Sequence, residues 1–341
     1  MLPRIDRILV WVVVLAFIVA AAIFVHVSAV WFDTRGQDIY YEWWQGRFLA
    51  EGKNPYVQVL DADMLGRNPE RVATYFPLLY VLYALTQLAG LKDYDRWVSF
   101  WRFIFMLFDV GLAALLFEVF RRRRRVLVGL LAAAFWFFNR WTLHVAVIGH
   151  VDFLPIFFLV LSLVWFGKRP WLSMVLFGVS LALKQIAIFL GPLYVIWMWR
   201  RARERRFRCA LYGALAVAAV PLAVSLPFIL WHAEAFFKSL AFSATRRSDA
   251  LLEAASIDAA LGLKGLSGRL PLLVLMALVY VGALRGHLRR YVSALLAMVV
   301  FTGFNPVLFP QYLCWVVPLA PLCALDYLEG QRRTATPARA P

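Results

Sequence analysis

Apolar segments alternate with short basic ones along most of this chain. A first apolar run covers residues 8–32, and further apolar segments follow at 76–91, 97–120, 126–148, 152–167, 171–184, 185–199, 209–231, 270–284, 291–304 and 311–328. A helix of roughly 20 predominantly apolar residues is needed to cross a bilayer. The pattern therefore predicts an all-α polytopic membrane protein with about ten transmembrane helices.

The basic residues between these segments predict the orientation of the chain. They cluster at residues 121–125, 200–208, 285–290 and 332–333. Cytoplasmic loops carry an excess of Lys and Arg, so these clusters should share the cytoplasmic side. They can do so only if segment 76–91 is a partial or surface helix that does not cross the membrane. Three loops then lie on the outer face, at residues 33–75, 232–268 and 305–311.

If the basic clusters are all cytoplasmic, residues 171–199 must enter the membrane from the cytoplasmic side and return to that side. This makes two short helices that meet near Lys184 and Gln185. Irregular backbone at membrane depth is tolerated only where it contacts protein or lines a water-filled cavity. We therefore expect a cavity at this point that opens to the outer face.

Composition agrees with a membrane protein and excludes other classes. The 341 residues are 63% hydrophobic and 16% charged, with a mean hydropathy of +0.71, which excludes a soluble domain. The net charge of +16 lies in the basic clusters and indicates attraction to anionic lipids rather than to nucleic acid. The three cysteines lack the spacing of a disulfide framework or a zinc site. Abundant Arg and Ala are typical of a GC-rich bacterial genome, and we expect a bacterial inner membrane.

We expect one integral membrane domain over residues 1–331 and a basic, disordered cytoplasmic tail over 332–341. The first apolar run, preceded by Arg4 and Arg7, is too long for the apolar region of a signal peptide. It therefore predicts an uncleaved first span.

The first outer loop is much longer than a connector needs to be. Ile39, Trp43 and neighbouring aromatic residues fall on one helical stripe that ends at Gly52, which predicts a helix lying on the membrane surface. Asp38 stands immediately before this stripe. Two interpretations remain open for Asp38, an N-cap of the helix or a catalytic carboxylate.

Ionisable residues at membrane depth are costly and usually functional. The candidates are Arg102, Asp109, Arg140, His144, His150, Asp152 and Lys184. Arg102 and Asp109 lie two helical turns apart on one helix face, and an ion pair, within the helix or with another helix, is the simplest interpretation for them. Lys184 has no charged neighbour in sequence and requires an anion, which a bound phosphate would supply.

Two further groups are candidates for binding ions. DxD-like pairs occur at Asp61 with Asp63 and at Asp93 with Asp95, but such pairs arise easily in polar loops, so a divalent metal is not favoured and no other cofactor is expected. Arg246 and Arg247 lie on the predicted outer side, against the positive-inside bias. These adjacent guanidiniums indicate either an anionic ligand or contact with lipid headgroups.

The order of short motifs along the chain resembles a known superfamily. Asp38 is followed by Gly52-x-Asn-Pro55-Tyr56, Tyr75-Phe-Pro77, Phe108-Asp109, Asn139-Arg140, Gly149-His150-x-Asp152, Lys184-Gln185 and Gln311-Tyr312-x-x-Trp315-x-x-Pro318. This order resembles the GT-C superfamily of membrane glycosyltransferases, nearest to the polyprenol-phosphate-mannose-dependent mannosyltransferases of glycosyltransferase family 87. It also resembles the catalytic subunit of GPI mannosyltransferase I. The resemblance runs over most of the chain and implies a GT-C-like fold.

The resemblance implies an inverting glycosyltransferase that moves a sugar, with mannose favoured, from a polyprenyl-phosphate donor to a lipid or glycan acceptor on the periplasmic side. It also implies that Asp38 is the catalytic base. The GPI enzyme has an Asp-x-Asp in this loop, whereas Gly36-Gln37-Asp38 retains only the second acid, which argues against metal dependence.

The chemistry of transfer suggests roles for the other candidates. Positive charge must stabilise the departing phosphate, and Lys184, Arg246 and Arg247 are the predicted donor-phosphate residues. The predicted residues for binding the sugar or the acceptor are His150, Asp152, Arg140, His144, Gln311 and Tyr312.

Two other classes of function remain open. A transporter or flippase of lipid-linked sugars would also carry charges at the membrane midplane, but it commonly shows related halves with paired broken helices, which this sequence lacks. A non-catalytic subunit that binds a lipid phosphate would retain Lys184 and the outer arginines without needing Asp38.

Overall fold

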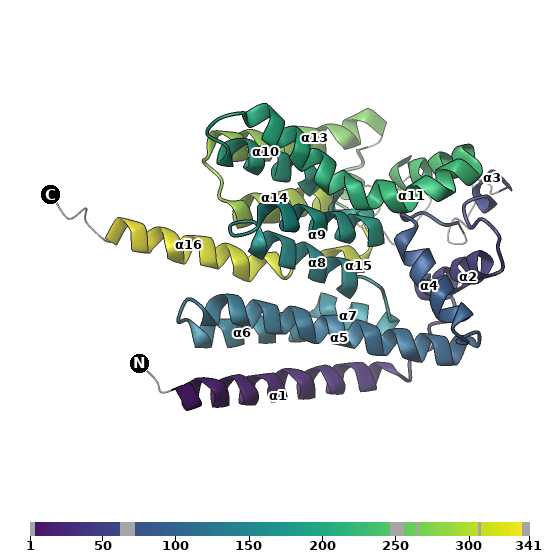
Figure 1. Cartoon of the computed structure of the whole chain (residues 1–341), viewed down its shortest axis with the longest axis horizontal. Coiled ribbons are helices and arrows are strands. Elements are labelled where there is room, and N and C mark those ends of the chain that lie inside the picture. Colours follow the sequence, from purple (N-terminus) through teal and green to yellow (C-terminus); the bar gives the residue numbers. More distant parts are fainter. Residues whose placement is uncertain (1–3, 62–71, 246–255, 264, 306–307, 336–341) are drawn as a thin grey trace.

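Every regular element that the structure describes is a helix, as the sequence predicts. The computed structural model describes residues 4–61, 72–245, 256–263, 265–305 and 308–335 (Figure 1). In chain order the helices are α1 (Arg4–Ala29), α2 (Asp38–Ala50), α3 (Gln58–Asp61), α4 (Leu78–Leu88), α5 (Tyr94–Arg121), α6 (Val126–Phe138), α7 (Arg140–Ile148), α8 (Phe153–Trp165), α9 (Pro170–Leu183), α10 (Gly191–Arg201), α11 (Arg206–Thr245), α12 (Ile257–Ala260), α13 (Gly265–Arg285), α14 (Arg290–Gly303), α15 (Pro310–Leu313) and α16 (Leu319–Ala335). A 3-10 helix, Gln185–Leu190, stands between α9 and α10.

Within the described residues, four helices are long and apolar enough to cross a membrane. The segments are Ile8–Ala29, Tyr94–Arg121, Arg206–Phe242 and Gly268–Arg285. Helices α6 and α7 make a fifth candidate if their bend of 48° lies within one span. Other apolar helices are shorter; α8 has 13 residues and α9 has 14. At ~1.5 Å per residue these do not reach across a hydrocarbon core of ~30 Å. The chain is thus a membrane protein, and ten spans are not confirmed.

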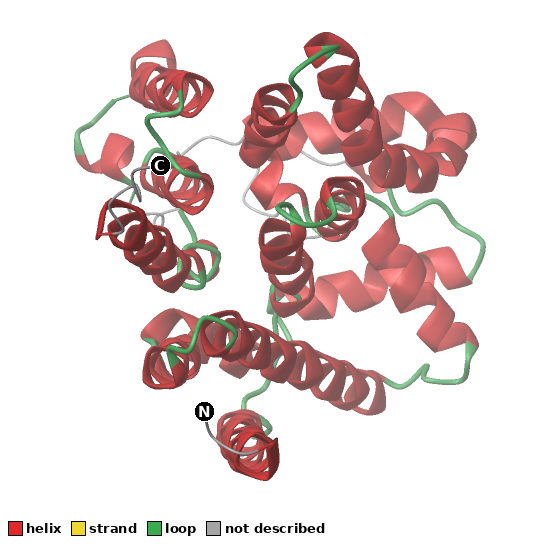
Figure 2. Cartoon of the chain, turned by 60° about the vertical axis from the view of Figure 1, so that its left-hand side comes forward, coloured by secondary structure: helices red, strands yellow, loops and turns green. Residues whose placement is uncertain are grey.

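The helices form one bundle with distinct ends. Figure 1 shows the start of α1 and the end of α16 on one side, together with the turns that follow α5, α10 and α13, and it shows α2, α3 and α4 on the opposite side. Figure 2, turned by 60°, shows several of the helices nearly end-on. The turns on the side of the termini contain the basic clusters 121–125, 200–208 and 285–290. The basic clusters therefore share one end of the bundle, and its cytoplasmic location stays a prediction.

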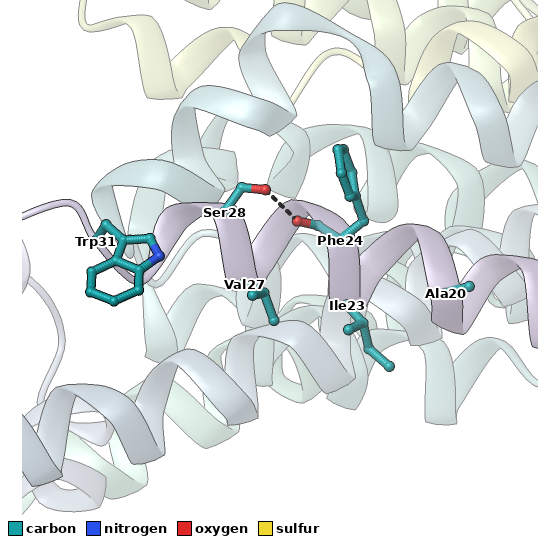
Figure 3. Close-up of a pocket in the computed structure, with 6 residues that line it drawn as sticks. All are labelled: Ala20, Ile23, Phe24, Val27, Ser28 and Trp31. Carbon is teal, nitrogen blue, oxygen red and sulfur yellow. Dashed lines mark hydrogen bonds between the residues drawn. The ribbon is translucent and has the colours of Figure 1, made fainter.

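The outward face of α1 has the character of a lipid-facing surface. Figure 3 shows a groove on this face, lined by Ala20, Ile23, Phe24, Val27, Ser28 and Trp31. Phe24 is 72% exposed and Trp31 is 90% exposed. Exposure of such large apolar side chains is unfavourable in water and favourable in contact with lipid. The Ser28 hydroxyl donates to the Phe24 carbonyl at 2.7 Å, so it is already satisfied within the helix.

The predicted helix after Asp38 is confirmed as α2 (Asp38–Ala50), and its location on a membrane surface stays a prediction. Its apolar stripe packs on protein, because Ile39 and Trp43 are buried and the Gln87 side chain of α4 donates to the Trp43 carbonyl at 2.9 Å. A Cβ added at Gly46 would lie 2.6 Å from Cβ of Tyr83. Glycine at this position therefore lets α2 approach α4 closely.

The predicted break at Lys184 is also confirmed. Helix α9 ends at Leu183, Lys184 has an extended backbone (φ −159°, ψ 121°), and the 3-10 helix starts at Gln185. Two short helical segments thus meet at this lysine, as the orientation argument requires.

The predicted outer loop 232–268 begins with a helix. Helix α11 continues to Thr245, with a kink at His232 (φ −160°, ψ 86°). Beyond the kink, Phe236 is buried and its ring lies 5.0 Å from that of Tyr56. The helical segment after the kink therefore packs against the segment that contains Tyr56, and the location of both on the outer face stays a prediction.

Candidate functional site

Four ionisable side chains from separate parts of the sequence form one network near α2. We call Asp38, His150, Asp152 and Lys184 the outer network. His150 Nε2 lies 2.9 Å from Asp38 Oδ2, and His150 Nδ1 lies 2.9 Å from Asp152 Oδ2. Lys184 Nζ lies 2.7 Å from Asp152 Oδ1. All four were predicted as site residues from the sequence, and the structure brings them together with acids and bases in alternation.

The contacts within the outer network differ in kind. His150 and Asp38 form a hydrogen bond, with the imidazole as donor when it is protonated. The contact of His150 with Asp152 has the distance of an ion pair, while no described donor has hydrogen-bond geometry toward Asp152 Oδ2. The ring of His150 is thus held between two carboxylates.

The ends of helices position these side chains. Asp38 is the first residue of α2, and Lys184 follows the last residue of α9. Gly149 ends α7 in the left-handed conformation (φ 64°, ψ 42°), which glycine adopts without strain. The turn at Gly149 brings His150 and Asp152 into the network before α8 begins.

The N-cap interpretation of Asp38 is wrong. Gln37 occupies the N-cap position of α2, and Asp38 is already helical. The Asp38 carboxylate instead contacts His150, which follows it by 112 positions in the chain. The interpretation of Asp38 as a catalytic carboxylate stays a prediction.

The outer network is buried at one end and open at the other. The side chains of Asp152 and Lys184 are 0% exposed and that of His150 is 1% exposed, whereas that of Asp38 is 43% exposed. Only Asp38 among the four therefore reaches a surface from which a substrate can approach.

Charges within the network keep its members ionised despite burial. Burial and the charge of Lys184 act to lower the pKa of His150, but Asp152 and Asp38 outweigh them and raise it to about 9. Burial opposes ionisation of Asp152, yet Lys184 and His150 lower the pKa of its carboxyl below the ordinary value. With His150 protonated, two carboxylates face two cations and their charges cancel.

Lys184 has its counter-ion within the chain. Asp152 supplies the anion, and Nζ also lies 5.1 Å from the centre of the Tyr75 ring. Lys184 therefore does not require a bound phosphate as its counter-ion. The sequence did not reveal the pair, because α8 and α9 separate the two residues in the chain. A contact between Lys184 and the donor phosphate stays a prediction.

Two residues beside the network were missed as site residues in the sequence. Glu42 lies four residues after Asp38 on α2, is 5% exposed, and accepts a hydrogen bond from the Tyr83 hydroxyl at 3.0 Å. The Trp315 indole donates to Asp152 Oδ1 at 3.0 Å. The helical spacing from Asp38 is a signal for Glu42, and the motif Gln311-Tyr312-x-x-Trp315 is one for the tryptophan.

The other predicted sugar or acceptor residues lie at varied positions. Gln311 and Tyr312 are on α15, which packs against α7. Gln311 is buried, and the Tyr312 ring lies 5.6 Å from that of Phe309. His144 is half-buried on α7 and near enough to His150 for their charges to interact.

Of the predicted cations outside the outer network, the structure describes Arg140 but not Arg246 or Arg247. Arg140 is exposed at the start of α7, over the ring of Trp141 at 5.2 Å, whereas His150 follows the other end of that helix. Arg246 and Arg247 lie outside the described residues.

Arg102 and Asp109 do not pair with each other, and among the described residues only Asp109 of the two has the predicted partner on another helix, His26. The Arg102 guanidinium donates to the carbonyl oxygens of Ala29, Phe32 and Val147. Ala29 is the last residue of α1, and carbonyl groups at a helix C-terminus attract cations. Arg102 therefore ties the ends of α1 and α7 together, a partnership that sequence spacing does not reveal.

Asp109 has partners on two other helices. Its Oδ2 lies 3.0 Å from His26 Nε2, and its Oδ1 accepts a hydrogen bond from the Trp136 indole at 2.6 Å. We call His26, Asp109 and Trp136 the interior cluster. Asp109 is 0% exposed and His26 is 7% exposed.

Two of the four acids in the DxD-like pairs have structural partners. Asp93 is the N-cap of α5, where its side chain accepts from the backbone N–H of Arg96. Asp95 pairs with the Arg35 guanidinium through contacts of 2.7 and 2.8 Å. Asp63 lies outside the described residues.

Comparison with known proteins adds no relative. No protein-family model matches the chain, and no curated protein matches it. Function is therefore inferred from the motifs and from the geometry of the outer network.

Proposed function

We propose that the protein is a membrane glycosyltransferase of the GT-C type. It transfers a sugar, with mannose favoured, from a polyprenyl-phosphate donor to a lipid or glycan acceptor at the outer face of a bacterial inner membrane. The order of the sequence motifs supports sugar transfer, and the geometry of the outer network supports base chemistry at Asp38. The shorter apolar helices would complete a GT-C-like set of about ten membrane-embedded helices by packing on the longer ones.

The position of Asp38 is the observation that carries the proposal. It is the exposed end of a chain of charges whose other members are buried, and it hydrogen-bonds to His150 at 2.9 Å. A non-catalytic subunit that binds a lipid phosphate has no need of such a carboxylate. A carboxylate held in one orientation at a surface is the arrangement that general base catalysis requires.

The reaction proceeds as a single displacement. Asp38 removes the proton from the acceptor hydroxyl while that oxygen attacks the anomeric carbon of the donor. The bond between this carbon and the phosphate oxygen breaks, and the polyprenyl phosphate departs with the bonding electron pair. Because one displacement occurs, the anomeric configuration inverts, as in inverting glycosidases.

His150 is a positioning residue in this reaction. Its hydrogen bond fixes the orientation of the Asp38 carboxylate, and Asp152 on the other side of the ring fixes the imidazole. A cationic donor also stabilises the ionised form of Asp38 and so makes it a weaker base. His150 therefore contributes orientation at some cost in basicity.

The donor phosphate requires positive charge that the outer network does not hold in excess. The charges of its two acids and two bases cancel, and Lys184 is 0% exposed. In this proposal Lys184 acts through Asp152, which it holds in place. Arg246 and Arg247 are then assigned to the departing phosphate, since a guanidinium matches phosphate oxygens.

A transfer assay with purified protein tests the proposal. The donor is a short-chain polyprenyl-phosphate mannose, with other sugars in parallel, and products are identified by mass spectrometry. We expect Asp38→Asn to lower kcat/KM by ~10² to 10⁴-fold, because it removes the proton acceptor and retains the shape. The matched control is Asp33→Asn, since Asp33 is 68% exposed in the same loop and should be dispensable.

Each outcome has a defined meaning. A wild-type protein without transfer activity toward any of these donors would overturn the proposed function. Transfer retained by Asp38→Asn and lost in Asp33→Asn would keep the enzyme and assign the base to Asp33.

A further inference from the structure

Glu42 is a buried carboxyl for which the reaction above gives no role. It lies one turn after Asp38 on α2, so the two carboxyls share one face of the helix. Its Oε2 accepts a hydrogen bond from the Tyr83 hydroxyl at 3.0 Å. Among the described residues, Oε1 has no hydrogen-bond partner although it is buried. A buried polar atom of this kind is costly to leave unpaired and calls for an explanation.

The surroundings of Glu42 connect it with the outer network. The charged and titratable groups that face it come from α2, from α4 and the segment before it, and from the ends of α7 and α9, namely Asp38, Tyr80, Tyr83, Tyr75, His150 and Lys184. Burial raises the pKa of Glu42 to about 7, and the charge of Asp38 acts in the same direction. The charges of His150 and Lys184 oppose this shift. Both forms of the carboxyl are therefore populated near neutral pH.

We propose that Glu42 is a substrate-binding residue of the same site, which in its protonated form donates a hydrogen bond from Oε1 to a hydroxyl oxygen of the transferred sugar. The inference rests on the proposed function and adds the group that recognises the sugar. A neutral carboxyl has one donor besides its acceptor positions. Tyr83 occupies Oε2, and Oε1 remains for the substrate.

The protonated form suits the site for electrostatic reasons. A second anion one turn from Asp38 would repel it, and it would also repel the phosphate of the donor. Bound substrate excludes water and so disfavours the ionised form further. A neutral carboxyl avoids these repulsions and still offers a directed hydrogen bond.

The proposal predicts a specific pH profile. For the wild type, kcat/KM should fall as the pH rises through about 7, the pKa of Glu42. At one pH unit above this value, only about a tenth of the molecules retain the proton, so the loss should be about tenfold. Glu42→Gln keeps an N–H donor and has no proton to lose. Its profile should stay level until about 9, where His150 deprotonates.

Two further variants sharpen the test. The hydrogen bond from Tyr83 to Oε2 favours the ionised form of Glu42. Tyr83→Phe removes this bond, so the midpoint of the pH profile near 7 should move to higher pH. Glu51→Gln is the control, because Glu51 lies at the end of the same helix, 41% exposed and paired with Lys53 and Arg47. Its profile should match that of the wild type.

The test separates this inference from the proposed function. Superimposable profiles of the wild type and Glu42→Gln, with Asp38→Asn inactive, would overturn the role of Glu42 and leave the transferase intact. If Glu42→Gln is not produced as folded protein, an unchanged midpoint in Tyr83→Phe overturns the role, and a raised midpoint supports it. A wild-type protein without transfer activity overturns both.

Discussion

The interior cluster and the outer network each contain a buried aspartate that contacts a histidine and a tryptophan, but the two regions use this aspartate in different ways. In the interior cluster, His26 and Trp136 each contact one oxygen of Asp109, at 3.0 and 2.6 Å. The three side chains come from α1, α5 and α6, all of which are candidate spans or parts of one. The cluster closes on itself, because both oxygens of the buried carboxyl are engaged within it.

The outer network also joins a histidine and a tryptophan to a buried aspartate. His150 and Trp315 contact Asp152, at 2.9 and 3.0 Å. Two residues distinguish it: Lys184 adds a second cation at 2.7 Å from Asp152, and Asp38 continues the chain of contacts to a side chain that is 43% exposed.

A structural polar cluster and a candidate active site can thus contain the same kinds of side chain. Burial of charge is common to both and does not distinguish them. The difference is a path of polar contacts from the buried charge to a group that a substrate can reach. Phe153 stands between the two regions, with its ring 5.8 Å from that of His26 and 6.0 Å from that of Trp136, while the preceding residue belongs to the outer network.

The largest expected contrast is between asparagine substitutions of one aspartate from each region. Asp38→Asn should lower kcat/KM by ~10² to 10⁴-fold and leave stability nearly unchanged. Asp109→Asn should cost ~1–3 kcal/mol of stability by disturbing a buried hydrogen-bonded carboxylate. Its kcat/KM per folded molecule should equal that of the wild type. Thermal unfolding in detergent, measured beside the transfer assay, checks both. A loss of kcat/KM in folded Asp109→Asn would show that the two regions are coupled.

The fold signals that succeeded in the sequence are local ones. The break at Lys184 was predicted from a charge inside an apolar run and from the requirement that the basic clusters lie on one side of the membrane. The structure shows this break. The helix α2 follows from a stripe of aromatic residues, and it is also present. The number of spans is not confirmed, because apolar composition does not tell a spanning helix from a short buried one such as α8.

The site was predicted as a set of residues but not as a set of pairs. Asp152 and Lys184 are separated by α8 and α9, and only the packing of these two helices brings them to 2.7 Å. Arg102 binds backbone carbonyls, and backbone groups carry no sequence signal for such a partnership. Spacing along one helix therefore misled the pairing of Arg102 with Asp109.

The next largest effect concerns the buried ion pair that only the outer network contains. Lys184→Met leaves Asp152 buried without its strongest partner and should cost ~3–5 kcal/mol of stability. The double variant Asp152→Asn/Lys184→Met should recover much of this loss, because it leaves no uncompensated charge. Equal destabilisation of the single and double variants would contradict the pairing. Lys53→Met is the control, since that pair is exposed and should contribute little.

The outer network should also make stability depend on pH. The folded state raises the pKa of His150 from 6.5 to about 9. The protonated histidine therefore stabilises the fold fully below about 6.5, and this contribution is lost as the pH rises through about 9. Apparent melting temperature should fall over this range in the wild type and fall less in His150→Gln. His287→Gln, which changes an exposed histidine, should retain the wild-type slope.

The smallest expected effects come from removing one indole N–H in each region. Trp136→Phe leaves Asp109 Oδ1 without its donor and should cost ~1–3 kcal/mol, the range for a buried acceptor left without a hydrogen bond. Trp315→Phe should cost less, because Lys184 still contacts the same oxygen of Asp152. Of the two variants, only Trp315→Phe should lower kcat/KM, by a few-fold, because Asp152 orients His150 toward Asp38. Both variants lose the same indole volume, so the cavity contributions largely cancel in the comparison. A larger loss of activity in Trp136→Phe would mean that the interior cluster, and not the outer network, sets the geometry of the base.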